Sequence, residues 1–276
     1  MKTGQPEAPK AARFFVGTSG FSYDDWTGPY YPGGLPSTKR FDYYASEFPC
    51  VEINSTYYGW LSEKTARSLV SRAPRGFRFT LKLHRSLTHE SGGQLQDGLA
   101  RTREQAGVFD SASALGCYLA QFPNSFRPGA EAFGKIEELA NGLTPLVVET
   151  RNSEWQKAEN ASRVGAMGAA ICCVDAPPVR GLPRWEPTRF GPVGYYRFHG
   201  RNAAKWYGHE EAWERYDYSY SREELAERAA DILAAEPDRD CYVFFNNHYG
   251  AQAVTNARQM ADLLGVPVSR PQPGLF

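Results

Sequence analysis

Short runs rich in β-branched and aromatic residues recur along the chain, and most are followed by a stretch with helical periodicity. The eight predicted strands are Arg13–Gly17, Cys50–Thr56, Phe77–His84, Cys117–Gln121, Leu146–Arg151, Ala169–Asp175, Tyr195–His199 and Cys241–Asn247. The predicted helices are Thr38–Glu47, Ser62–Arg72, Gly93–Ser113, Pro128–Ala140, Ser153–Ala166, Ser221–Ala235 and Ala251–Leu264. Alternating strands and helices predict an α/β fold with parallel strands, and eight such repeats favour a single (β/α)₈ TIM barrel.

One segment interrupts this alternation. Pro177–Gly194 is rich in proline and shows no helical pattern, so we expect a long loop over the mouth of the barrel or at its edge. Residues 13–276 contain no linker, repeat or low-complexity block and are expected to form one domain. Residues 1–12 are polar and lack an apolar signal region, so we expect a disordered lead-in.

The third predicted strand shows which side chains face the inside of the barrel. Alternate strand residues face opposite sides, and the outward side must be apolar because helices cover it. The apolar set is Phe77, Phe79, Leu81 and Leu83, which leaves Arg78, Thr80, Lys82 and His84 to point inward. The same alternation applies to three further strands. It places Glu52, Asn54 and Thr56 of the second strand inward, together with Val147, Glu149 and Arg151 of the fifth. In the seventh strand the inward residues are Tyr195, Arg197 and His199, and Arg201 follows shortly after. Unpaired buried charges are costly, so these groups are expected to pair with one another or with a ligand, at the strand ends where this fold carries its active sites.

Composition narrows the class of protein. The 276 residues suit a barrel, which needs about 250. Lys and Arg (31) balance Asp and Glu (31), which argues against nucleic-acid binding through bulk positive charge. The five cysteines lie in or beside apolar runs without a CxxC pair, as expected of reduced thiols in a cytoplasmic protein. No apolar run approaches the roughly 18 residues of a membrane span.

Several motifs resemble one known family. They are Gly17 to Tyr23 (GTSGFSY) with Trp26, Val51 to Tyr57 (VEINSTY), Lys82 with Thr88 and His89, Glu149 with Arg151 and Trp155, Arg197 to Arg201 (RFHGR), and Phe245 to Asn247 (FNN) with Gly250, Ala253 and Asn256. From about Phe14 to Leu264 the chain resembles the YecE-like family, a domain of unknown function, which implies a TIM barrel but no reaction. The family's motif residues map onto Tyr23, Glu52, Asn54, Lys82, His89, Glu149, Arg151, Arg197, His199, Arg201, Asn246 and Asn247. One departure is Thr150, where the family more often has a bulkier side chain; its outward parity should leave the pocket unaffected.

The carboxylates and the lysine each allow two interpretations. Glu52 and Glu149 could act as an acid/base pair, as in glycoside hydrolysis, or serve as structural anchors for Arg78, Lys82 or Arg151. Lys82 could form a Schiff base if the pocket desolvates it, or stay charged and bind substrate oxygens. Lys82 and His199 are both expected to polarise the substrate.

Arginines point to an anionic ligand. Arg151, Arg197 and Arg201 are expected to clamp an anion, and barrels of this kind often bind phosphate between the loops after strands seven and eight, here near Gly250. Alternatively, Asn246 and Asn247 satisfy backbone groups at the strand exit. Tyr23 and Trp206 are the best candidates for ring contacts with the ligand, and His89 would cap a loop or bind the ligand.

Metal ligation is the weaker alternative. His84, His199 and His248 could join Glu52, Glu149 and Asp175, but no HxH or HExxH spacing is present, and nearby cations would oppose a dication. We therefore assign no metal ligands and leave the cofactor open. The leading hypothesis is a hydrolase- or lyase-like enzyme acting on a small phosphorylated or sugar-derived substrate. The alternatives are a metal-assisted phosphodiesterase acting on nucleic acid and a non-catalytic metabolite-binding module.

Overall fold

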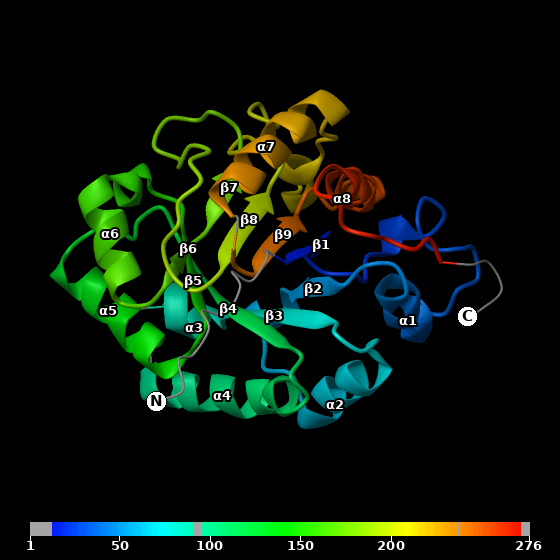
Figure 1. Ribbon diagram of the computed structural model, residues 1–276, viewed down its shortest axis with the longest axis horizontal. Coiled ribbons are helices and arrows are strands. Elements are labelled where there is room, and N and C mark those ends of the chain that lie inside the picture. Colours follow the sequence, from blue (N-terminus) through cyan, green and yellow to red (C-terminus); the bar gives the residue numbers. More distant parts are fainter. Residues whose placement is uncertain (1–12, 91–94, 237, 272–276) are drawn as a thin grey trace, which may run out of the picture.

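A computed structural model describes residues 13–90, 95–236 and 238–271 (Figure 1). The predicted lead-in, residues 1–12, lies outside the described residues. The strands are β1 (Phe14–Thr18), β2 (Cys50–Ile53), β3 (Arg78–Lys82), β4 (Leu115–Phe122), β5 (Leu146–Thr150), β6 (Ala170–Ile171), β7 (Cys173–Asp175), β8 (Gly194–Phe198) and β9 (Cys241–Phe245). All named strand pairs are parallel, as predicted.

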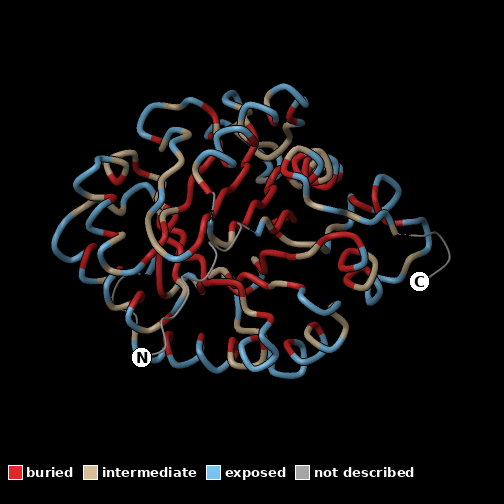
Figure 2. The backbone as a smooth tube through the Cα atoms, in the orientation of Figure 1, coloured by how far each residue is buried: buried red, intermediate tan, exposed pale blue. Residues whose placement is uncertain are grey.

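Helices surround the strands and bury their apolar faces against them (Figures 1 and 2). They are α1 (Arg40–Ala45), α2 (Glu63–Arg72), α3 (Arg85–Thr88), α4 (Leu95–Ser111), α5 (Ala130–Gly142), α6 (Ala158–Ala166), α7 (Arg222–Ala235) and α8 (Gln252–Leu263). Each predicted helix is present with shifted ends, and the short α3 was not predicted. Capping explains where α7 begins: its N-cap is Ser221, whose side chain forms a capping box with Glu224.

The prediction of one closed barrel is met only in part. Hydrogen bonding divides the strands into a four-stranded sheet of order β1-β9-β8-β7 and a five-stranded sheet of order β2-β3-β4-β5-β6. The predicted sixth strand is interrupted at Cys172: β6 before it pairs with β5, and β7 after it pairs with β8. At the other seam, β1 and β2 are joined by an isolated bridge between Ser19 and Glu52 and by the Gly20 N–H, which donates to the Glu52 carbonyl at 2.8 Å.

Both sheets nevertheless contribute to one inner core. Its members are Phe15, Cys50, Cys117, Leu119, Val147, Ala170, Cys172, Val174, Val193, Tyr195, Tyr242 and Phe244. The outward apolar set predicted for the third strand packs instead in the larger outer core with the helices. The structure thus confirms the inward direction predicted for Glu52, Lys82, Glu149 and Arg197, whose side chains belong to one polar network. Two predictions for residues beyond the strand ends are not met in this way: Thr56 belongs to a short 3-10 helix (Ser55–Tyr57), and His84 has a different partner. His84 lies beyond the end of β3, at the N-cap of α3, and its ring stacks on Trp60 with centroids 4.6 Å apart.

The irregular segment between β7 and β8, predicted to lie over the mouth or at the edge of the barrel, packs in part against the outside of the sheet. The ring of Trp185 packs 5.6 Å from Tyr196 and 5.5 Å from Phe198, both of which point outward. Farther along, the Arg239 guanidinium donates to the carbonyls of Thr188, Phe190 and Gly191, and so anchors the segment to the chain before β9. The segment therefore takes the position that a helix would otherwise fill.

Replacing Gly17 by alanine is expected to lower the free energy of unfolding by about 1–3 kcal/mol. A Cβ at this position of β1 would lie 2.4 Å from the carbonyl oxygen of Cys50, so the backbone at the β1–β2 seam would have to move. Gly33→Ala is the matched control, because nothing lies within 4 Å of its Cβ position. Equal urea denaturation midpoints for the two variants would contradict the expected close approach of the strands.

Candidate functional site

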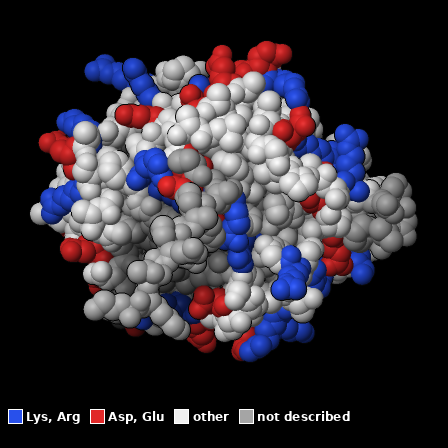
Figure 3. Space-filling model, viewed as in Figure 1, with Lys and Arg blue, Asp and Glu red and all other residues white. Residues whose placement is uncertain are grey.

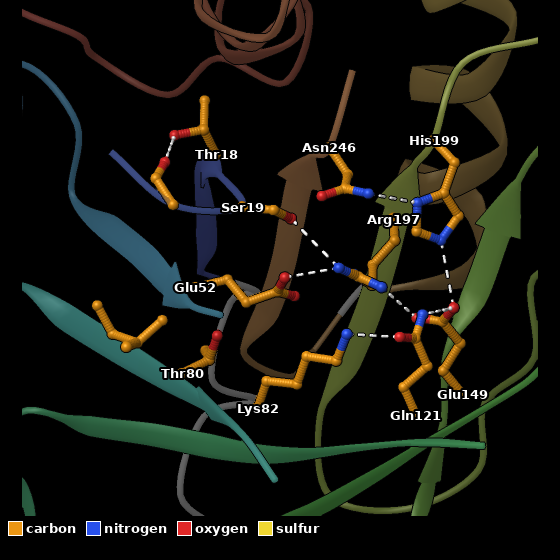
Figure 4. A network of polar contacts seen from close by, with 12 residues as sticks. Thr18, Ser19, Glu52, Thr80, Lys82, Gln121, Glu149, Arg197, His199 and Asn246 are labelled. Carbon is orange, nitrogen blue, oxygen red and sulfur yellow. Dashed lines mark hydrogen bonds and ion pairs between the residues drawn. The ribbon is translucent and has the colours of Figure 1, made fainter. Parts of the chain in front are cut away.

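An arginine and two glutamates form the buried centre of the site (Figure 4). The Arg197 guanidinium on β8 donates to Glu52 of β2 at 2.7 Å and to Glu149 of β5 at 2.5 Å. The side chains of all three are at most 1% exposed. We call Glu52, Arg197 and Glu149 the ion triad. It joins the two sheets, because Arg197 lies in the four-stranded sheet and both glutamates lie in the five-stranded one.

Neighbouring groups hold Glu149 and Arg197 in their charged forms. Burial alone would raise the pKa of Glu149, but Arg197 and His199 hold it well below its usual value. Burial alone would likewise lower the pKa of Arg197, but the two glutamates raise it. The second oxygen of Glu52 accepts a hydrogen bond from the Tyr195 hydroxyl at 2.6 Å. Both predicted carboxylates are therefore paired inside the protein, but their partner is Arg197. Of the partners that the structural alternative named, Arg151 lies nearest, with its Nε 3.8 Å from Glu149.

Lys82 points toward the same centre from β3. Its Nζ donates to Gln121 Oε1 at 2.5 Å, and Gln121 in turn donates to Glu149 at 2.6 Å. The ring of Tyr57 lies 4.6 Å from Nζ. Burial, followed by the charge of Arg197, lowers the pKa of Lys82 to about 7. A large fraction of this amine is therefore uncharged near neutral pH.

His199 completes the network from the end of β8. Its Nδ1 lies 3.0 Å from the Asn246 side-chain nitrogen, which can only donate, so Nδ1 is the acceptor. The other nitrogen, Nε2, then carries the proton and donates it to Glu149 at 3.2 Å. Burial lowers the pKa of His199 to about 4, so the ring is neutral at neutral pH.

Arg151 and two aromatic residues lie at the rim. The Arg151 side chain is 21% exposed, and its Nε lies 3.8 Å from Glu149. Its guanidinium lies 5.6 Å from the centre of the Trp206 ring and hydrogen-bonds to Tyr216. Burial alone would raise the pKa of Tyr216, but Arg151, Arg215 and Arg197 together lower it from its usual value.

Three further predicted site residues, Tyr23, Asn54 and His89, have other partners than the ion triad or none in the described part of the chain. Tyr23 stacks on His248 with centroids 4.6 Å apart and donates to the Ser19 carbonyl at 2.5 Å. Asn54 follows β2 directly, and its Oδ1 is buried without a hydrogen-bond partner in the described part of the chain. The exposed His89 ring meets Tyr57 edge-on at 5.1 Å.

Comparison with known proteins gives the family. The profile described as "Protein of unknown function DUF72" matches residues 15–274. The chain belongs to this family. A DUF72 family protein from Thermotoga maritima MSB8 has a solved structure that is 34% identical, with a TM-score of 0.83 over 91% of this chain and 99% of that one.

Two further relatives extend the comparison of the DUF72 protein. A DUF72 family protein from Enterococcus faecalis V583 is 23% identical, with a TM-score of 0.83 over 96% of this chain and 100% of that one, and shows the shared fold. The UPF0759 protein YunF of Bacillus subtilis (strain 168) is 24% identical over 273 residues, covering 92% of this chain and 96% of YunF.

The structure does not bring every predicted residue of the DUF72 protein to the ion triad. Arg201 forms a two-point ion pair with Asp175, with contacts of 2.8 and 2.6 Å, and contacts Glu224 at 2.6 Å. Asn247 is buried and donates to Asn256 and to the Tyr218 carbonyl, both at 2.8 Å. It therefore satisfies local groups at the strand exit, as the alternative interpretation expected.

The predicted phosphate position near Gly250 is already occupied by a side chain. The Gly250 N–H donates to the Asp25 carboxylate at 2.7 Å. With Arg201 also paired, the two groups expected to bind an anion between the last two loops have carboxylate partners in the folded chain.

The described residues do not form the metal site that the alternative interpretation would need. In the described ranges, no group of three His, Cys, Asp or Glu residues lies close enough together to hold an ion. The three candidate histidines point to different partners: His84 to Trp60, His199 to Glu149 and His248 to Tyr23.

On the face shown in Figure 3, basic and acidic side chains are interspersed. Within the described chain, no helix combines the length and apolar character needed to cross a bilayer.

Some members of the site were missed in the sequence. Gln121 ends a predicted strand and has inward parity, but its side chain is neutral, and only the charged inward residues of neighbouring strands were predicted to form the site. Tyr216 lies in a short 3-10 helix, η5 (Ala212–Tyr216), of the loop after β8, outside any periodic segment. Inward parity could have found Gln121, whereas no sequence signal marks Tyr216.

Proposed function

We propose that this DUF72 protein is an enzyme in which Lys82 exchanges a proton with a small phosphorylated or sugar-derived substrate bound above the ion triad. The observation that carries the proposal is a buried amine with a pKa of about 7, hydrogen-bonded to Gln121 and lying next to fixed charges. A general base works best when its pKa lies near the working pH. Structural ion pairs alone would not require a lysine with a depressed pKa at this position.

The proposal changes the roles expected for the carboxylates. A glycosidase acid must be protonated when it meets its substrate. Glu149 is held ionised by Arg197 and His199, so it serves better as a fixed anchor than as an acid. In this scheme Glu52 and Glu149 orient Arg197, and the neutral His199 stabilises Glu149. Lys82 carries the proton transfer.

We further infer that the two sheets act as one distorted TIM barrel and that residues 13–276 form one domain. The shared inner core and an ion triad that spans both sheets support this. The YecE-like motifs include Glu52, Lys82, Glu149 and Arg197, and we infer that they describe the same family as the matched profile. A cytoplasmic location remains part of the proposal, because all five cysteines are free and buried.

The pKa of Lys82 can be measured directly. Protein labelled with ¹³C at lysine Cε gives one signal for each of the eight lysines in the sequence. Titration of the Cε shift is expected to give one lysine a midpoint near 7, and Lys82→Arg should remove that signal. The exposed Lys39 is the matched control, since Lys39→Arg should leave the low midpoint in place.

A Lys82 midpoint near the ordinary value of about 10.4 would overturn the proposal. The protein would then resemble the non-catalytic alternative, in which a permanently charged lysine binds ligand oxygens. A low midpoint together with copurifying small molecules, detected by mass spectrometry and lost in the Lys82→Arg variant, would support the enzyme.

A further inference from the structure

Arg151 is an arginine of the site with donors left for a ligand. The nearest carboxylate oxygen in the described chain, on Glu149, is 3.8 Å away, beyond hydrogen-bonding distance. Arg197, by contrast, is buried between two glutamates, and Arg201 is paired with Asp175 and Glu224. The stacking on Trp206 and the hydrogen bond to Tyr216 hold Arg151 in place without neutralising its charge.

Lys82 and Arg151 are joined through Glu149. The charge of Arg151 contributes to lowering the pKa of Lys82 and of His199, although burial is the main cause for both. In sequence, Arg151 follows Glu149 by two residues, and Lys82 reaches Glu149 through Gln121. A partly exposed guanidinium and the Lys82 amine therefore lie on the same carboxylate, the first directly at 3.8 Å and the second through Gln121.

We propose that the substrate is a carbonyl compound with an adjacent anionic group, which Arg151 binds while Lys82 forms an imine with the carbonyl carbon. This inference deepens the proposed function and rests on it. An uncharged amine is the nucleophile that imine formation requires, and a planar guanidinium binds a carboxylate or phosphate with two parallel hydrogen bonds. Bound in this way, the anion would bring the neighbouring carbonyl to Nζ.

The step balances without an added oxidant or reductant. The Lys82 nitrogen lone pair forms a bond to the carbonyl carbon, and the carbonyl π electrons move to oxygen. The amine then gives up its two protons, and the oxygen leaves with them as water while C=N replaces C=O. The Glu149 and Glu52 carboxylates would stabilise the protonated form of this imine, because both raise the pKa of the Lys82 amine.

Reductive trapping with two aldehyde probes tests the proposal. Glyoxylate carries a carboxylate beside its aldehyde, whereas glycolaldehyde carries a neutral hydroxymethyl group. Each probe is added with cyanoborohydride, and adducts are located by peptide mass spectrometry, with the exposed Lys39 as internal standard. The ratio of Lys82 to Lys39 labelling is expected to be at least about tenfold higher with glyoxylate, as expected for a charge-assisted contact.

Two arginine variants show whether the anion preference comes from Arg151. Arg151→Leu is expected to reduce the glyoxylate preference about tenfold. Arg228→Leu is the matched control, because Arg228 is equally exposed (21%) and lies over a tryptophan, Trp185, at 4.9 Å, away from the ion triad. This control should keep the preference within about twofold of the unmodified protein.

The outcomes separate the two proposals. Equal labelling of Lys82 by both probes, or labelling no faster than that of Lys39, would overturn the imine and the anion subsite. If the Cε titration still gives Lys82 a midpoint near 7, proton transfer by Lys82 stands without them. Because the preference is measured first on the unmodified protein, the result does not depend on the folding of any variant.

Discussion

Arg197→Met is expected to lower the free energy of unfolding by about 3–5 kcal/mol, enough to remove much of the stability of an ordinary domain. Arg197 pairs with Glu52 and Glu149, both of which are almost fully buried. Without the guanidinium, two carboxylates would face each other in the interior without a counter-ion. Urea denaturation at neutral pH, monitored by tryptophan fluorescence, measures the loss.

Two controls separate the loss of charge pairing from the loss of side-chain packing. Glu52→Gln and Glu149→Gln combined with Arg197→Met should recover much of the stability, because replacing a whole buried ion network by neutral groups is often close to neutral. Arg67→Met breaks a pair with Glu63 whose side chains are 69% and 68% exposed, and should cost less than about 1 kcal/mol. A triple variant as unstable as Arg197→Met would show that packing, and not charge, explains the loss.

Stability is expected to fall by up to about 3 kcal/mol between pH 6.5 and 4 because of His199 alone. Its pKa is about 4 in the folded protein, lowered by burial, against about 6.5 in the unfolded chain. Across this window the unfolded chain binds more protons, so the free energy of unfolding rises with pH and decreases as the pH falls. At pH values below the usual pKa of glutamate, the lowered pKa of Glu149 further decreases the free energy of unfolding as the pH falls.

His199→Gln tests this origin, since glutamine can still donate to Glu149 but does not titrate. Urea denaturation at a series of pH values should show a shallower slope between pH 6.5 and 4 for this variant. His209→Gln is the matched control, because His209 lies in the loop after β8 beside Lys205 and Arg215, away from Glu149. Parallel slopes for the unmodified protein and His199→Gln would place the acid sensitivity elsewhere.

The two effects have one structural origin. Charged and titratable groups sit between the inner core and the rim, where water is largely excluded. Arg197 keeps Glu52 and Glu149 in place, and the same positive charge helps to keep Lys82 uncharged. Removing Arg197 should therefore raise the midpoint of Lys82 as well as destabilise the fold, provided that the variant is studied under conditions where it stays folded.

The sequence by itself determined which strand residues face inward. Alternation along a strand is a local property of extended backbone, so it correctly assigned Glu52, Lys82, Glu149 and Arg197 to the inside before any pairing was known. The parallel, alternating architecture followed from the same local patterns. His84 was wrongly assigned because it lies beyond the last residue of β3 and caps α3, where the chain turns into a helix.

Only the tertiary structure decided which of these groups meet. Arg197 contacts two glutamates that lie 145 and 48 residues away in the sequence, while Arg201, four residues later, turns to Asp175. The break at Cys172 and the Asp25 carboxylate at Gly250 likewise depend on how distant segments are brought together. Side-chain direction is set by neighbouring residues in the chain, whereas ion pairs and pKa values depend on burial and on the charges that folding places nearby.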